Sequence, residues 1–450
     1  MSGSLRSGTG PGEVWDAPTH SVRHGHAPLD ATVEVPGSKS LTNRFLVLAA
    51  LADAPVTMRG GLVSRDSALM IEALRALGVS VDVGADAWTI TPGPPRGGVS
   101  IDCGLAGTVM RFVPPLALLA GIGGDLRPIT FDGDPGARVR PMGALIDALR
   151  ALGAAVEDDG RGTLPFTVTP PNSVPDAVDV DSSASSQFVT ALLLVAPRLP
   201  GGLTVRHVGE VLPSLPHIDM TCETLRSAGV RVDQPDERTW VVHPGALSLD
   251  DVRVEPDLSN AGPFMAAALA AGGTVRIPGW PAVTTQPGAR YPDLLERMGG
   301  RCVLDGDVMT ITGTGEVRGI TADLSPAGEI TPTIAALCAI ASGGSELTGI
   351  GHLRGHETDR LAAIATEVER VGGVCLAGDD SLTFGGVPSR DDASGGLSGA
   401  VMETYHDHRM ATFAAIVGLV VPAIQVINVG TTAKTMPDFP SMWSDMLDGE

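Results

Sequence analysis

Apolar and polar positions along the chain follow one pattern that recurs six times. Each copy opens with a short polar or glycine-containing segment, continues as an Ala- and Leu-rich run of helical length, and stops at Gly or Pro before a β-branched stretch. The openings lie at 38–40, 105–108, 185–187, 258–262, 328–331 and 406–409. Equivalent points at 44, 111, 187, 263, 333 and 410 are 67, 76, 76, 70 and 77 residues apart. The repeat therefore has the size of a structural unit rather than of a short motif.

A second helical signal lies inside each repeat, with apolar residues three and four apart and Gly at the stop. It covers 71–78, 145–153, 220–229, 294–299 and 368–372, with a weaker copy at 442–447. Each repeat thus predicts helix, strand, helix and strand with β-rich joins, which is an α/β pattern. Three repeats in each of two domains place a boundary near Pro256, so we expect one domain at 36–256 and the other at 1–35 plus 257–450. The first 28 or so residues, rich in Gly, Ser and His, are predicted to be a loose tail.

Composition narrows the class of protein. The 450 residues carry a formal net charge of −21, which opposes binding to nucleic acid and to anionic membranes. The run from Ala411 to Val421 is far shorter than the ~20 residues that span a bilayer, and the N-terminus lacks a secretory pattern. The five Cys include no C-x-x-C pair, so neither disulfides nor structural zinc is expected. A cytoplasmic protein is predicted, and the absence of heptads favours a monomer.

The few basic residues are informative because an acidic chain must hold an anionic ligand with local positive charge. Lysine occurs only at 39 and 434 among 31 Lys and Arg, and an ammonium can exchange a proton where a guanidinium cannot. Lys39, Arg44 and Arg111 stand in or just after helix openings, where free backbone N–H groups attract phosphate and carboxylate. We expect these helix ends to converge on a site for small anions.

Two kinds of cofactor are not expected. His406, Asp407 and His408 could be read as metal ligands, but no third ligand set stands at a recognised spacing. No Walker-type or dinucleotide-type glycine loop occurs, so a nucleotide cofactor is also not predicted.

Several motifs together resemble the 5-enolpyruvylshikimate-3-phosphate synthase family, and the resemblance runs from about Pro36 to about Phe439. They are PGSKS at 36–40, AGTVMR at 106–111, SSQF at 185–188, HETDRL at 356–361, DHRM at 407–410 and AKT at 433–435. The resemblance implies an inside-out α/β barrel of two domains, each with three βαβαββ units, and a ligand site between them. It implies transfer of the enolpyruvyl group of phosphoenolpyruvate to the 5-hydroxyl of shikimate 3-phosphate, through a tetrahedral intermediate, in chorismate biosynthesis. No cofactor is implied.

The resemblance also implies roles for individual residues. The expected catalytic residues are Lys39, Glu329 and Glu357. Glu329 would take the proton of the 5-hydroxyl, and the other two would move protons at the methylene carbon. Shikimate 3-phosphate would bind Lys39, Ser40, Arg44, Ser185, Ser186, Gln187, Ser214, Glu329 and His356. Phosphoenolpyruvate would bind Lys39, Gly107, Arg140, Gln187, Arg360, Arg409 and Lys434, with Arg111 in support. Gly107 stands at the position associated with inhibition by glyphosate.

Four positions depart from the family's usual pattern. His356 replaces a Lys, Leu105 an amide, His217 an aromatic hydroxyl, and Glu329 an Asp. Three alternatives stay open. A UDP-N-acetylglucosamine enolpyruvyl transferase would share the repeats but usually keeps a Cys in the loop that here spans 133–141. A non-catalytic phosphometabolite-binding protein would need neither Glu329 nor Glu357. An RNA-phosphate cyclase is disfavoured by the negative charge and by the lack of a nucleotide-reactive histidine motif.

Overall fold

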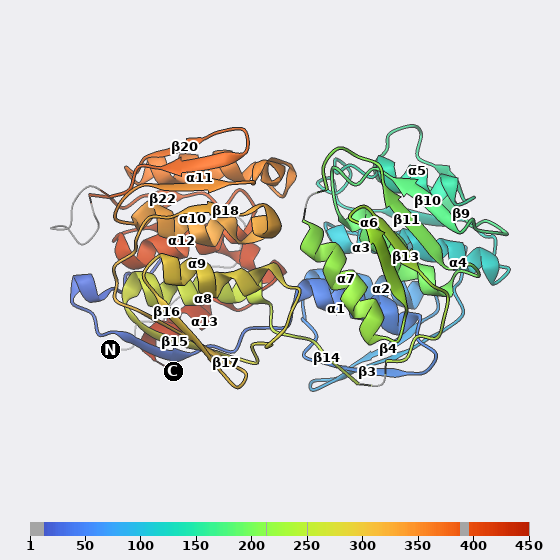
Figure 1. Ribbon diagram of the computed structural model, residues 1–450, viewed down its shortest axis with the longest axis horizontal. Helices are drawn as coiled ribbons and strands as arrows, with labels where there is room; N and C mark the ends of the chain where they lie inside the picture. Colours follow the sequence, from blue (N-terminus) through green and yellow to red (C-terminus); the bar gives the residue numbers. More distant parts are fainter. Residues whose placement is uncertain (1–12, 213, 250, 388–395, 450) are drawn as a thin grey trace. The chain divides into compact units, whose positions relative to one another are not determined.

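The computed structural model describes residues 13–212, 214–249, 251–387 and 396–449. The chain divides into two compact units (Figure 1). Unit 1 combines Met1–Pro36 with Pro256–Glu450, and unit 2 is the continuous stretch Gly37–Glu255. Within the described residues, no helix is long and apolar enough to cross a membrane.

Unit 2 contains three copies of one strand and helix arrangement. The third copy runs β10, α6, β11, α7, β12 and β13, and its sheet has the order β10-β11-β13-β12, with the first pair parallel and the others antiparallel. The other two sheets, β6-β7-β9-β8 and β14-β3-β5-β4, follow the same order. The strands are β3 (Val56–Arg59), β4 (Ser80–Val83), β5 (Trp88–Thr91), β6 (Ser100–Asp102), β7 (Ile129–Asp132), β8 (Ala155–Glu157), β9 (Phe166–Thr169), β10 (Ala177–Val180), β11 (Leu203–His207), β12 (Val232–Asp236), β13 (Thr239–Val242) and β14 (Asp251–Arg253). The helices are α1 (Lys39–Ala50), α2 (Arg65–Ala76), α3 (Gly107–Phe112), α4 (Ala117–Ile122), α5 (Gly143–Ala151), α6 (Gln187–Val195) and α7 (Leu215–Ser227).

Unit 1 repeats this arrangement. Its described strands form the sheets β16-β17-β15-β2, β18-β19-β21-β20 and β1-β23-β22. These are β1 (Val14–Asp16), β2 (Leu29–Thr32), β15 (Gly273–Pro278), β16 (Arg301–Asp305), β17 (Val308–Gly313), β18 (Thr321–Asp323), β19 (Ser345–Thr348), β20 (Cys375–Ala377), β21 (Ser381–Phe384), β22 (Val401–Met402) and β23 (Gln425–Ile427). The helices are α8 (Leu258–Ala271), α9 (Tyr291–Arg297), α10 (Thr331–Ile340), α11 (Arg360–Arg370), α12 (His408–Val420) and α13 (Phe439–Asp448). The expected α/β fold class, built from βαβαββ units, is confirmed.

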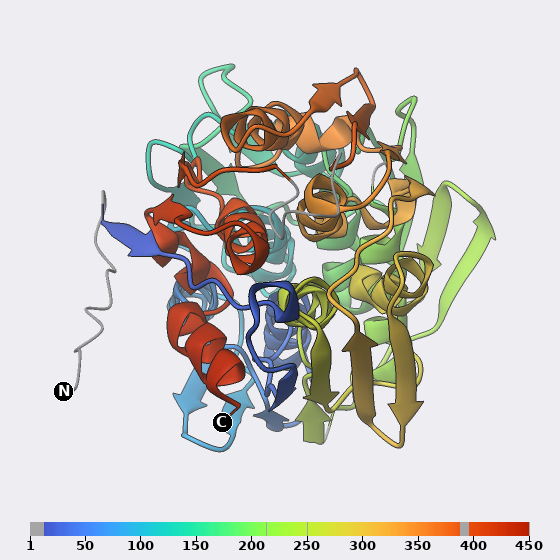
Figure 2. The same ribbon diagram turned by 90° about the vertical axis from the view of Figure 1, so that its left-hand side faces the viewer.

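The helices that begin at the six polar openings form the interior of each unit. In unit 1, α8, α10 and α12 pack against one another, and every residue of α8 and α10 is buried. Figure 2 shows the helices of this unit nearly end-on, with the strands on the outside. In unit 2, α1, α3 and α6 contact one another in the same way. A helix that is apolar on all sides is stable only when surrounded by protein, which explains the Ala- and Leu-rich runs.

The prediction of a loose N-terminal tail is wrong for the part of it that the structure describes. Trp15 lies in β1, which pairs antiparallel with β23, and its ring is 6.2 Å from that of Phe439 in edge-to-face geometry. Ala17 and Ser21 are buried. The sixth repeat has only β22 and β23 of its own within the described residues, so β1 supplies an antiparallel strand from the other end of the chain. The first twelve residues lie outside the described part.

Candidate active site

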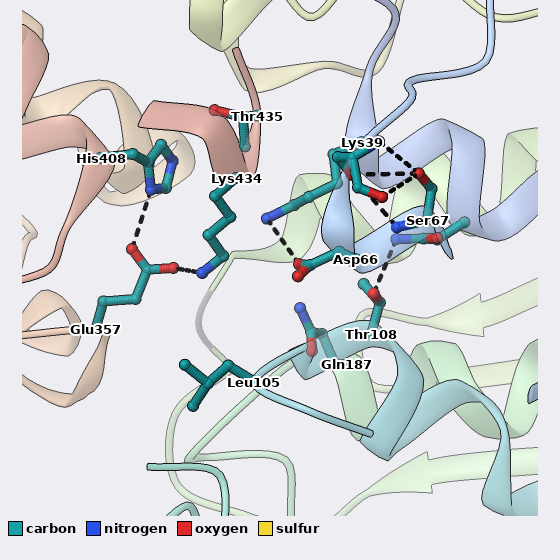
Figure 3. Close-up of polar contacts among 12 residues, drawn as sticks. Lys39, Asp66, Ser67, Leu105, Thr108, Gln187, Glu357, His408, Lys434 and Thr435 are labelled. Atoms are coloured by element: carbon teal, nitrogen blue, oxygen red, sulfur yellow. Dashed lines mark hydrogen bonds and ion pairs between the residues drawn. The ribbon is translucent and has the colours of Figure 1, made fainter. Parts of the chain in front are cut away.

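In unit 2, Lys39 is the first residue of α1, which the Ser38 side chain caps by accepting a hydrogen bond from the Leu41 N–H. The Lys39 ammonium lies 3.8 Å from the carboxylate of Asp66, in the first turn of α2 (Figure 3). Asp66 is almost completely buried, whereas Lys39 is partly exposed. A buried carboxylate attracts the ammonium group of a neighbouring lysine, so Asp66 of α2 orients the Lys39 side chain. Asp66 was not among the predicted site residues, and its only signal in the sequence is an acid two residues after the capping residue Ser64.

Two guanidinium groups flank Gly107 at the start of α3. A Cβ atom added at Gly107 would lie 3.3 Å from Arg111 Nη1 and 3.4 Å from Arg140 Nη1. Arg111 donates a hydrogen bond of 2.8 Å to Gln187 Oε1 at the start of α6, and Arg140 Nη1 lies 3.3 Å from the Leu105 carbonyl oxygen. Burial lowers the pKa of Arg111 to about 10, and the charge of Arg140 acts in the same direction. Across the described residues, neither guanidinium has a carboxylate within ion-pair distance, so this corner is suited to an anion.

Arg44 is buried and connects α1 to α7. Its guanidinium donates to the Ser40 carbonyl, to Thr221 Oγ1 and to the His217 carbonyl at 2.8 to 2.9 Å. It also lies 5.4 Å from the centre of the Phe112 ring. The structure therefore gives Arg44 a connecting role, and its expected contact with shikimate 3-phosphate stays a prediction.

The remaining expected residues of unit 2 lie at starts of helices. Ser185 and Ser186 precede Gln187, the first residue of α6, and the Gln187 N–H lies 3.3 Å from Ser185 Oγ. Ser214 precedes α7 with a φ of +55°, a conformation uncommon for a residue with a side chain. Asn43 of α1 donates to Thr108 Oγ1 of α3 at 2.8 Å, so the starts of the buried helices α1, α3 and α6 lie together.

In unit 1, Glu329 lies directly before α10 and contacts the two other buried helices. It accepts a hydrogen bond from Ser259 Oγ at the start of α8, and the Arg409 guanidinium in the first turn of α12 is 3.8 Å away. The starts of α8, α10 and α12 therefore lie together, as the starts of the buried helices do in unit 2. The side chain of Glu329 is 19% exposed, so its carboxylate is accessible to a ligand.

Glu357 is the centre of an ionic network in the same unit (Figure 3). Its carboxylate accepts a hydrogen bond from Lys434 Nζ, and it lies 3.1 Å from His408 Nδ1 and 3.6 Å from Arg360 Nη2. Burial alone would raise the pKa of Glu357, but the charges around it, with Lys434 and Arg360 among them, hold that pKa well below its usual value. The carboxylate is therefore ionised beside an ammonium, the arrangement that proton transfer needs.

Arg360 is buried and binds a second carboxylate. Its guanidinium donates to both oxygens of Asp407, at 2.7 and 3.2 Å, and neither side chain is more than 3% exposed. Asp407 also caps α12 by accepting from the Arg409 N–H at 2.9 Å. The pair thus fixes α11 against the start of α12 and sets the direction of Arg409.

One group of potential metal ligands lies in this network. Oxygen and nitrogen atoms of Glu357, Asp407 and His408 lie within 4.8 Å of one another. Arg360 and Lys434 already contact these carboxylates, and their charges oppose a further cation. The group therefore fits an ionic network better than a metal centre.

His356 occupies the position where the resembled family usually has a fixed cation. Its Nδ1 accepts a hydrogen bond from Arg360 Nη1 at 3.2 Å, because a guanidinium can only donate. Burial lowers the pKa of His356 well below its usual value, and Arg360 and His352 act in the same direction. The imidazole is therefore neutral and offers Nε2–H as an uncharged donor. His352, whose ring is 5.8 Å from that of His356, was also missed in the sequence, where it looked like an ordinary loop residue.

Acidification is expected to destabilise unit 1 partly through His408. Burial lowers the pKa of His408, so below about pH 6.5, the usual value for histidine, the unfolded chain binds more protons than the folded chain. The free energy of unfolding should therefore fall as the pH decreases through that range. Urea denaturation at several pH values will measure the slope, which should be smaller in His408→Asn, a variant that keeps a donor toward Glu357. Equal slopes in the two proteins would contradict this assignment.

Comparisons with known proteins give one consistent answer. The EPSP synthase model, described as 3-phosphoshikimate 1-carboxyvinyltransferase, matches residues 23–443. Proteins named 3-phosphoshikimate 1-carboxyvinyltransferase from Kocuria rhizophila and Bifidobacterium longum are each 52% identical to the chain. The first alignment covers 97% of both chains, and the second covers 96% of this chain and 98% of the relative.

Solved structures resemble the chain in fold. EPSP synthase from Acinetobacter baumannii has a TM-score of 0.78 at 24% identity, covering 96% of this chain and 98% of that one. The enolpyruvyl transferase NikO from Streptomyces tendae has a TM-score of 0.71 at 19% identity, covering 97% and 98%. The family model and the sequence relatives span nearly the whole chain, and the chain therefore belongs to the EPSP synthase family.

Proposed function

We propose that this enzyme transfers the enolpyruvyl group of phosphoenolpyruvate to the 5-hydroxyl of shikimate 3-phosphate and releases phosphate, as a step of chorismate biosynthesis. The observation that carries the proposal is the ionised Glu357 hydrogen-bonded to Lys434 and surrounded by Arg360 and His408. A protein that only binds its ligands needs no such acid–base pair. The names of the two relatives support the same reaction.

The proposed steps assign one task to each charged group. Glu329 takes the proton of the 5-hydroxyl while the hydroxyl oxygen attacks C2 of phosphoenolpyruvate. The methylene carbon of phosphoenolpyruvate gains a proton and becomes a methyl group. Loss of a proton from that methyl group then expels phosphate and forms the enol ether. Lys39 and Glu357 share the proton transfers at carbon, and the arginines stabilise charge on the phosphate and the carboxylate.

The ligand assignments follow the polar helix starts. Shikimate 3-phosphate is proposed to bind Ser40, Arg44, Ser185, Ser186, Gln187 and Ser214, together with Lys39, Glu329 and His356. Phosphoenolpyruvate is proposed to bind Gly107, Arg140, Arg360, Arg409 and Lys434, together with Lys39 and Gln187, with Arg111 holding Gln187 in place. Support comes from the two guanidinium groups beside Gly107, which have no carboxylate partner among the described residues.

Three further features belong to the proposal. The two units are proposed to be the two domains that carry the halves of the substrate site. The enzyme is proposed to act as a monomer on small molecules and without a cofactor. It is proposed to act in the cytoplasm, where its scattered unpaired cysteines would stay reduced. Glyphosate is proposed as an inhibitor that competes for the space beside Gly107.

Replacing Gly107 by Ala should reduce inhibition by glyphosate and raise KM for phosphoenolpyruvate. The added methyl group would lie 3.3 Å from Arg111, 3.4 Å from Arg140 and 3.7 Å from Gln187 Oε1, within the space proposed for both ligands. Inhibition curves for the two proteins at equal saturation with phosphoenolpyruvate will measure the shift. Gly245→Ala, which has open space around its Cβ position and no positive φ, is the matched control and should behave as wild type. If glyphosate inhibits Gly107→Ala as strongly as wild type, it does not bind beside Gly107.

The reaction itself is tested by incubating the protein with phosphoenolpyruvate and shikimate 3-phosphate and following free phosphate. Phosphate and the enol ether should appear in equal amounts. The same assay with UDP-N-acetylglucosamine in place of shikimate 3-phosphate tests the related transferase and should give no phosphate. Binding of both substrates without phosphate release would instead support a sensor protein.

A further inference from the structure

A buried histidine in unit 2 holds the segment that leads into α6. His207 is the last residue of β11, which runs parallel to β10, and it lies opposite Val180 at the end of β10. The chain leaves β10 through Asp181 and reaches Gln187 at the start of α6. Along this path the Ser182 N–H donates a hydrogen bond of 3.1 Å to His207 Nδ1. Ser182 is fully buried and His207 is 4% exposed.

This hydrogen bond fixes the proton on the imidazole. A backbone N–H can only donate, so Nδ1 must be unprotonated and the ring proton must lie on Nε2. The bond therefore exists only while His207 is neutral. A second proton, at Nδ1, would place two N–H groups face to face and would break the bond.

The same segment is held at two neighbouring points. The Ser183 N–H donates to Asp181 Oδ1 at 2.9 Å, and the Ser185 N–H donates to the Ser182 carbonyl at 3.0 Å, which turns the chain toward α6. Gly209, two residues after His207, lies so close that an added Cβ would be 2.1 Å from Asp181 Oδ1 and from Ser183 Oγ. The strand end that carries His207 thus supports the whole turn.

We propose that His207 is a positioning residue for shikimate 3-phosphate: as a neutral acceptor it holds the turn at Ser182, so that Ser185, Ser186 and Gln187 stand in their substrate-binding positions. This inference rests on the proposed function of those three residues. His207 itself is not proposed to touch substrate, because it acts through the backbone of Ser182.

Few charged groups face this histidine. Asp181 is close enough to interact with it electrostatically. In the turn between β12 and β13, Arg238 accepts from the His207 N–H through its carbonyl, while its guanidinium donates to the carbonyls of Gly209 and Glu210. Arg206 and Asp179 pair with each other on exposed positions of β11 and β10. The α6 helix contributes no titratable side chain.

Two substitutions separate the hydrogen bond from the bulk of the side chain. His207→Asn keeps an acceptor near the position of Nδ1, whereas His207→Leu fills a similar volume without an acceptor. His207→Leu should raise KM for shikimate 3-phosphate about tenfold, the change expected from one lost buried hydrogen bond, with kcat little changed. His207→Asn should restore KM. Equal KM values for the two variants would overturn the proposal.

One further measurement keeps the test independent of turnover. Hydrogen exchange of the 182–187 segment, corrected for intrinsic rates, should be faster in His207→Leu than in His207→Asn. Equal exchange in the two variants would overturn the proposal. Absence of any phosphate release by wild type would contradict the proposed function alone, since the exchange experiment would still report on the hydrogen bond.

Discussion

Replacing Lys39 by Ala is expected to lower kcat by about 10²- to 10⁴-fold, the range for removal of a general acid or base. Lys39 is one of only two lysines in the chain, and its ammonium is held by the buried carboxylate of Asp66 at 3.8 Å. The variant loses both the transferable proton and a positive charge at the start of α1. Phosphate release at saturating concentrations of both substrates will measure the effect.

Lys39→Arg separates these two contributions. A guanidinium keeps the charge but does not release its proton in a protein, so this variant should bind phosphoenolpyruvate better than Lys39→Ala and yet turn over as slowly. Turnover of Lys39→Arg close to that of wild type would assign Lys39 to binding and leave the proton transfers to Glu357. A severe loss of kcat in Lys39→Ala together with a normal kcat in Glu329→Ala would contradict only the proposed role of Glu329 as the base for the 5-hydroxyl.

Replacing Arg360 by Met should destabilise the protein by about 3–5 kcal/mol, the usual effect of removing one partner of a buried ion pair. Asp407 is fully buried and would keep an uncompensated charge at the start of α12. Urea denaturation, followed by a probe that reports on unit 1, will measure the free energy of unfolding.

The exposed pair between Arg276 and Asp30 in the same unit provides the control. Arg276→Met should change stability by no more than about 1 kcal/mol, because water and salt screen that pair. The double variant Arg360→Met with Asp407→Leu should recover much of the lost stability while remaining inactive. A cost for Arg360→Met as small as that for Arg276→Met would show that the buried pair does not stabilise unit 1.

The repeat was predictable because it depends on local patterns. All six polar openings begin helices, and the Ala- and Leu-rich runs that follow are the buried helices of the two units. The weak signal at 442–447 also belongs to a helix, α13. Caps such as Ser38 and Asp407 could be recognised from residue type and position alone.

Contacts between distant segments were not predictable in the same way. The strand β1 has only three residues, and its partner β23 begins more than 400 residues later in the sequence. Asp66 beside Lys39 and His207 beside Ser182 depend on the packing of separate elements within one repeat, and no local pattern marks either residue. Arg44 looked like a ligand-binding residue, yet its guanidinium also connects two helices, which sequence spacing cannot reveal.

The way the sheets are completed has a consequence for synthesis of the chain on the ribosome. The strands β1 and β2 emerge first, but they pair with β23 and β15, which emerge hundreds of residues later. Unit 2 is continuous from Gly37 to Glu255 and holds all partners of its own sheets, so it can fold while the rest is still being translated. The N-terminal segment must wait, and unit 1 closes only when the last repeat has left the exit tunnel.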